Sequence, residues 1–110
     1  NSAGMSTPSD KIIGISPQEY QDAIKSDKKV LVNFYAEWCA PCKKMAPYIL
    51  KIQEDFKDKI VIIRLDADKN KTIVGSLKLE GLPVVILYKN GKEIWRNIGY
   101  ISEEDLKTHL

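Results

Sequence analysis

Residues 35–44 read Tyr-Ala-Glu-Trp-Cys-Ala-Pro-Cys-Lys-Lys and contain both cysteines of the chain, Cys39 and Cys42. A nearly unbroken apolar run, residues 30–35, precedes them, which is typical of a strand that is buried on both faces. An amphipathic pattern with helical spacing begins near Pro41. The sequence therefore predicts a strand that delivers Cys39 to the beginning of a helix. Cysteines spaced as Cys-x-x-Cys in this βα context indicate thiol–disulfide exchange.

The segments on either side predict an α/β domain. Apolar runs predict strands over 12–15, 30–35, 60–65, 84–88 and 94–98. Helices are expected after the capping box of Ser16 and Glu19, after the cysteines, over 72–79, and after Ser102. Asn90-Gly91 predicts a type I′ hairpin between the last two strands. This order indicates three layers around a mixed sheet, with a ligand crevice at the carboxyl ends of the parallel strands.

Length and charge exclude several classes of protein. The chain has 110 residues, and 17 basic against 15 acidic residues give a net charge of +2. Such a mixed, nearly balanced charge argues against nucleic-acid binding or membrane attachment driven by charge. No apolar run reaches transmembrane length, so membrane insertion is not expected. We expect residues 1–10 to be a disordered or vector-derived lead and residues 11–110 to form a single domain.

Residues 1–10 also lack the apolar stretch of a signal peptide. The sequence as given therefore predicts a cytoplasmic protein, or a periplasmic or other extracytoplasmic one if a signal peptide has been removed.

Disulfide exchange needs a thiolate, an accessible sulfur and a second thiol that resolves the mixed disulfide. A helix N-terminus stabilises the thiolate through its free amides and partial positive charge, and Lys43 adds a nearby cation. Cys42 lies about one turn further along, so we expect it to be less exposed than Cys39 and to act as the resolving thiol.

Four other interpretations of the cysteine pair carry less weight. A structural disulfide that closes so short a loop constrains little chain. A zinc site lacks ligands, because His109 is the only histidine and there is no second cysteine pair. Covalent haem attachment requires a histidine after Cys42, where Lys43 stands. A merely packed pair is disfavoured by Trp38 and Pro41, which are poor core residues at a helix start.

Several separated motifs resemble the thioredoxin family. They are residues 33–43, Pro47, residues 66–68, Gly81-Leu82-Pro83, Asn90-Gly91 and Gly99, and together they span about residues 10–110. The resemblance implies a thioredoxin fold, three-layer α/β/α, with a mixed five-stranded central sheet and four helices. It also implies a protein-disulfide reductase in which Cys39 is the nucleophile, Cys42 is the resolving residue, and the two form a redox disulfide.

The resemblance further implies the partners and the contact surface. Substrates would be protein disulfides, electrons would come from a thioredoxin reductase or another dithiol donor, and the protein would act as a monomer without metal or organic cofactor. The Leu82–Pro83 bond would be cis. The residues that support or contact the substrate would be Trp38, Ala40, Pro41, Leu82, Pro83 and Gly99.

Three positions depart from the family pattern and are expected to tune the site, together with Lys43. Ala40 replaces a glycine between the cysteines, a position that influences the reduction potential. Asn33 stands where thioredoxins carry a buried aspartate, and Arg64 stands where a lysine neighbours it. Because an amide cannot transfer protons at neutral pH, we hypothesise that water or Cys39 deprotonates Cys42. Alternatively, Asn33 is a buried, hydrogen-bonded amide without a kinetic role.

Two other functions remain open at this point. One is an extracytoplasmic thioredoxin-like reductase or oxidant of narrow specificity. The other is a non-catalytic thioredoxin-fold binding module, in which disulfide turnover is incidental.

Overall fold

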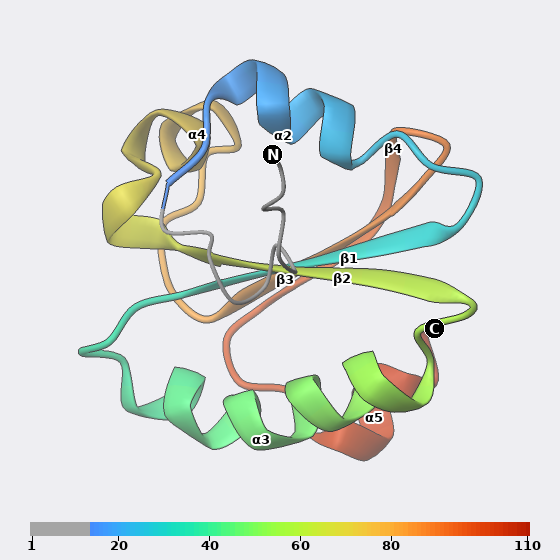
Figure 1. Ribbon diagram of the computed structural model, residues 1–110. Coiled ribbons are helices and arrows are strands. Elements are labelled where there is room, and N and C mark those ends of the chain that lie inside the picture. The colour runs from blue at the N-terminus through green and yellow to red at the C-terminus, as the bar shows by residue number, and fades with distance from the viewer. Residues whose placement is uncertain (1–13) are drawn as a thin grey trace, which may run out of the picture.

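The computed structural model describes residues 14–110 (Figure 1). Along the chain, helices and strands alternate until the last two strands, which follow one another directly. Helices α2 and α4 cover one face of the sheet, and α3 and α5 cover the other. The elements are α2 (Pro17–Ala23), β1 (Lys29–Tyr35), α3 (Ala40–Asp55), β2 (Ile60–Asp66), the 3₁₀ helix η2 (Ala67–Lys69), α4 (Lys71–Ser76), β3 (Val84–Lys89), β4 (Lys92–Ile98) and α5 (Glu103–Lys107).

The sheet is mixed and has the strand order β2-β1-β3-β4. Strands β1 and β2 are parallel, whereas β3 pairs antiparallel with both β1 and β4. The predicted α/β class, mixed sheet and four α-helices are therefore confirmed within residues 14–110.

The predicted count of five strands is wrong for the described residues, which contain four. The expected first strand, 12–15, begins outside them. Its last two residues, Gly14 and Ile15, are not in a strand. The Ile15 amide instead donates to the side-chain oxygen of Asn70, 2.9 Å away, so a loop contact replaces a strand contact there.

Local sequence signals set several element boundaries. Ser16 and Glu19 form the predicted capping box at the start of α2. Asn90 and Gly91 both have positive φ angles, 54° and 78°, as the predicted type I′ turn requires. Helix α4 is shorter than expected and ends at Ser76, since Lys78 has a left-handed φ of 59°.

Alternate residues of β1 face the two sides of the sheet. Val32 and Phe34 are fully buried in the cluster beneath α2 and α4, and Leu31 is fully buried against α3 and α5. By the same alternation, Asn33 lies on the face of Leu31, under the beginning of α3. A polar side chain thus interrupts an otherwise apolar strand on the side of the cysteines.

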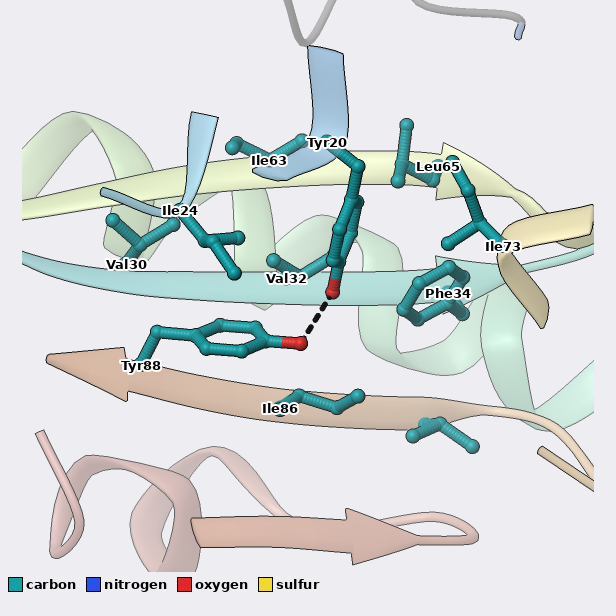
Figure 2. Packing of buried hydrophobic residues seen from close by; sticks show 11 residues of the cluster. Tyr20, Ile24, Val30, Val32, Phe34, Ile63, Leu65, Ile73, Ile86 and Tyr88 are labelled. Atoms are coloured by element: carbon teal, nitrogen blue, oxygen red, sulfur yellow. Dashed lines mark hydrogen bonds between the residues drawn. The ribbon is translucent and has the colours of Figure 1, made fainter. Parts of the chain in front are cut away.

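Two tyrosines share a hydrogen bond inside the first cluster. The hydroxyl oxygens of Tyr20, on α2, and Tyr88, on β3, lie 2.7 Å apart among aliphatic side chains (Figure 2). Burial raises the pKa of both hydroxyls, so the pair stays protonated under ordinary conditions. The two hydroxyls therefore share one hydrogen bond within a cluster of buried hydrophobic residues.

This pairing makes the single substitution Tyr88→Phe destabilising. It leaves the buried Tyr20 hydroxyl without its partner, which costs about 1–3 kcal/mol of unfolding free energy. Replacing both tyrosines with phenylalanine removes both polar groups and should cost less than the sum of the single changes. Urea unfolding of the two single variants and the double variant measures the coupling. Strictly additive losses would contradict a shared buried hydrogen bond.

Candidate active site

Cys39 occupies the N-cap position of α3, four residues after β1 ends at Tyr35. Its backbone is extended, with φ −94° and ψ 107°, and its Sγ accepts a hydrogen bond from the Cys42 amide at 3.3 Å. Pro41, in the first turn, has no amide proton to leave unpaired. The Cys39 sulfur therefore lies at the end of α3 that carries the partial positive charge.

Cys39 and Cys42 form a disulfide, and both residues are buried. Their exposed fractions are 3% and 4%, so the expectation that Cys42 is the less exposed of the two is wrong. The reason is that one small cluster covers both: Ala36 lies with the cysteines, and Tyr35 and Leu82 pack against them.

The segment before β3 lies beside this cluster and is fixed by two backbone features. The Leu82–Pro83 peptide bond is cis. The carbonyl oxygen of Pro83 accepts a hydrogen bond from the Gly99 amide at 2.7 Å. Gly99 follows β4 directly and has a φ of 99°, a region that favours glycine. This hydrogen bond thus joins the end of β4 to the segment whose Leu82 packs against the cysteines.

Trp38 extends away from the core, with 69% of its surface exposed. Its indole Nε1 donates to Oδ2 of Asp68 at 2.8 Å. The Asp68 amide in turn donates to Oδ1 of Asp66 at 2.9 Å. The contact of Trp38 with Asp68 was not predicted. The parallel register, in which Tyr35 pairs with Asp66, brings the two loops together, and no local pattern reveals it.

Asn33 is 2% exposed and lies opposite Arg64 in the β1–β2 pairing. Its Oδ1 accepts from Arg64 Nε at 3.3 Å. Its Nδ2 donates to the carbonyl oxygens of Phe34 and Val84 at 3.4 and 3.5 Å. Asn33 is therefore a buried amide with partners for both of its ends.

Arg64 connects Asn33 to a surface cleft. Its guanidinium lies over the Tyr35 ring, 4.3 Å from the ring centroid, a cation–π geometry. Burial is the main influence and lowers the pKa of Arg64, while Tyr35 acts in the opposite direction. The cleft has a volume of about 420 Å³ and is lined by Tyr35, Ala36 and Glu37 after β1, by Cys42, Lys43 and Ala46 of α3, and by Arg64 of β2.

This cleft lies at the carboxyl end of the parallel pair β1–β2, where the ligand crevice was expected. Ala40, Pro41 and Lys43 are exposed on the first turn of α3. Within residues 14–110, no group of three or more histidine, cysteine, aspartate or glutamate side chains could hold a metal ion. In the same part of the chain, no helix is both long and apolar enough to cross a membrane.

Comparison with known proteins identifies the family. The family model for thioredoxin matches residues 11–110. The thioredoxin of Alicyclobacillus acidocaldarius subsp. acidocaldarius is 35% identical over 96 residues, which cover 87% of this chain and 91% of the relative. The thioredoxin of Acidithiobacillus ferridurans is 34% identical over 103 residues, covering 93% and 95%.

The solved structures agree with the sequences. The structure of Plasmodium falciparum thioredoxin superposes with a TM-score of 0.79 and 28% identity, covering 89% of this chain and 95% of that one. The chain therefore belongs to the thioredoxin family and is a thiol–disulfide oxidoreductase.

Proposed function

We propose that this protein reduces disulfide bonds in protein substrates, with Cys39 as the nucleophile and Cys42 as the resolving thiol. The observation that carries the proposal is the N-cap position of Cys39, whose Sγ accepts a hydrogen bond from the Cys42 amide at 3.3 Å. A thiolate at that position gains a charge-assisted hydrogen bond and the favourable field of a 16-residue helix. The thiolate form of Cys39 is thereby stabilised over the thiol, as a nucleophile requires.

The exchange proceeds in two steps. The Cys39 thiolate attacks one sulfur of the substrate disulfide, which forms a mixed disulfide and releases the first substrate thiolate. Cys42 then loses its proton and attacks Cys39 Sγ, which closes the Cys39–Cys42 disulfide and releases the second substrate thiolate. The released thiolates take up two protons, and two electrons pass to the substrate. A thioredoxin reductase or another dithiol donor returns two electrons to the cysteine pair, and no metal or organic cofactor takes part.

Substrate binding is proposed at the surface around Leu82. Leu82 packs against the cysteine pair, and its cis bond to Pro83 precedes β3. An extended substrate segment could pair with the backbone there, as in strand addition to a sheet edge. Apolar contact area is supplied by the exposed side chains of Trp38, Ala40 and Pro41. The Gly99 amide donates a hydrogen bond to the Pro83 carbonyl oxygen and so supports this segment.

In the second step Cys42 must lose a proton, and the buried β1 residue on the side of Cys42 is an amide and not an acid. Asn33, on β1, is 2% exposed, and its amide neither accepts nor releases a proton at neutral pH. Asp66, at the end of β2, is also buried, but its Oδ1 accepts the hydrogen bond of the Asp68 amide at the start of η2. We propose that Cys42 transfers its proton to water, because the Cys39 sulfur is already bonded to the substrate in the mixed disulfide and is no longer a base. The cleft beside Cys42 gives water a route to this thiol.

The reduction potential of the Cys39–Cys42 pair tests the direction of transfer. Equilibration of the purified protein with defined ratios of reduced and oxidised glutathione or dithiothreitol, followed by thiol alkylation, measures it. A reductase should have a potential more negative than about −180 mV, the value typical of protein disulfide isomerase. A potential above about −180 mV would contradict the proposed direction and indicate an oxidant. The variant Ser76→Cys, on α4 across the sheet from α3, controls for alkylation of an unrelated thiol.

A further inference from the structure

The cleft beside Cys42 contains a cation, Arg64, for which residues 14–110 provide no ion-pair partner. This arginine is half-buried. Its Nε donates to the neutral amide oxygen of Asn33, and its guanidinium lies over the Tyr35 ring. Neither terminal guanidinium nitrogen has a hydrogen-bond acceptor among the described residues.

Arg96, in contrast, has a hydrogen-bond acceptor for each of its three guanidinium nitrogens. Its Nε and one terminal nitrogen donate to the two carboxylate oxygens of Glu93, at 2.6 and 2.8 Å. Its other terminal nitrogen donates to the carbonyl oxygen of Leu77 at 3.2 Å. Arg64 has the same donors but no carboxylate, although partial burial makes a counter-charge more valuable there.

Besides Arg64, the cleft is lined by a second cationic side chain and by apolar side chains. Lys43 lines the cleft together with Arg64. Glu37, the one acidic residue of the lining, forms no ion pair with either cation. The Tyr35 ring and Ala46 supply apolar surface. A volume of about 420 Å³ lies in the range of sites for small organic molecules.

We propose that this cleft is a binding site for a small monocarboxylate with a compact apolar body. The two terminal nitrogens of Arg64, which have no acceptor within residues 14–110, bind the carboxylate side by side, a geometry that matches a guanidinium fork. Lys43 contributes a second positive charge, and the apolar body lies against Tyr35 and Ala46. The site goes beyond the proposed function, because neither step of disulfide exchange requires an occupant.

Occupancy of the cleft has a consequence for Cys42, which forms part of its wall. A bound carboxylate places negative charge near the resolving sulfur, and a like charge disfavours the thiolate. A saturating monocarboxylate should therefore slow the resolution of a mixed disulfide on Cys39 without slowing the first attack. The ligand thus acts as a regulator of the second step.

Benzoate is the probe that tests the site, and benzamide is its neutral isostere. The oxidised protein is titrated with sodium benzoate at constant ionic strength and followed by proton–nitrogen NMR. We expect saturable shifts at Arg64 Nε and at the amides of the cleft, and binding of benzamide at least about tenfold weaker. Absence of saturation, or equal binding of benzamide, would overturn the proposal.

Matched variants assign the binding to Arg64. Arg64→Gln should raise the Kd for benzoate at least about tenfold, whereas Arg96→Gln, which removes an already paired arginine, should leave it unchanged. Glu37→Gln removes the negative charge of the lining and should lower the Kd. Equal Kd values for Arg64→Gln and the parent protein would refute the assignment. If Arg64→Gln does not fold, the Glu37→Gln and benzamide comparisons still decide the question.

The outcome is separable from that of the proposed function. The reduction potential and the two-step exchange are measured without benzoate, so a protein that binds no carboxylate can still be a reductase. Conversely, an oxidising potential leaves the benzoate titration of the oxidised protein interpretable.

Discussion

Replacing Cys39 with serine is expected to abolish the reduction of protein disulfides. A serine hydroxyl is not ionised at neutral pH and cannot attack a disulfide, so the chemical step is lost even though the N-cap hydrogen bond can form. The rate should fall at least about 1,000-fold, which corresponds to about 4 kcal/mol of activation free energy. Turbidity or fluorescence assays of a disulfide-bonded protein substrate, with dithiothreitol as the donor, measure the loss.

Cys42→Ser is the matched control for this prediction. It retains the proposed nucleophile, so the first attack should proceed and a covalent mixed disulfide with the substrate should accumulate. Intact-mass spectrometry detects that adduct, and Cys39→Ser should not form it. If the adduct forms on Cys42 in the Cys39→Ser variant instead, the assignment of the two roles is reversed.

The double variant Cys39→Ser/Cys42→Ser separates an enzyme from a binding module. An oxidoreductase loses its biological activity when both thiols are removed. A module that uses the fold only for docking retains that activity, because the surface around Leu82 and Gly99 is unchanged.

Asn33→Asp is expected to change the pH dependence of disulfide exchange more than any other single substitution that keeps both thiols. The introduced carboxylate would lie beneath the cysteines at a position that is 2% exposed. A like charge there disfavours both thiolates, so the ascending limb of the pH–rate profile, which reports formation of the thiolate, should move to higher pH. The carboxyl also adds an ionisation of its own, because it can accept the proton of Cys42.

The same substitution should make stability depend on pH. Burial raises the pKa of the introduced carboxyl above its unfolded value of about 3.9, and the hydrogen bond from Arg64 offsets only part of that. The folded state then binds more protons than the unfolded state between the two pKa values. Relative to the parent, stability is therefore present below about pH 3.9 and is lost as the pH rises through the folded pKa.

Urea unfolding across the pH range measures this loss, and stopped-flow exchange measures the rate profile. Asn90→Asp makes the same chemical change at an exposed turn residue and should alter neither. If the rate profiles of Asn33→Asp and the parent protein coincide, Asn33 has no bearing on proton transfer and is simply a buried, hydrogen-bonded amide.

Features that are determined by a few neighbouring residues could be predicted from the sequence. The capping box of Ser16 and Glu19, the hairpin at Asn90 and the placement of Cys39 at a helix start all depend on spacings of a few residues. Each of these patterns acts through local hydrogen bonds or backbone angles. For this reason the order of the helices and strands could be predicted from them.

Features that depend on tertiary contacts could not be predicted in the same way. The bond from Trp38 to Asp68 requires the exact pairing of β1 with β2, and a shift of one residue would remove it. The equal burial of the two cysteines depends on Leu82, which arrives from a segment 40 residues away from Cys42. That Arg64 forms no ion pair within residues 14–110 depends likewise on tertiary structure, because it requires the positions of the charged side chains around the cleft.

The N-cap position of Cys39 couples folding to chemistry, because one sulfur atom serves both. The hydrogen bond that Cys39 Sγ accepts from the Cys42 amide caps the N-terminus of α3, and the same bond stabilises the attacking thiolate. Whatever loosens the first turn of α3 therefore also weakens the nucleophile, and every mixed disulfide on Cys39 perturbs the start of that helix. The reactivity of this protein is thus a property of its secondary structure as much as of its side chains.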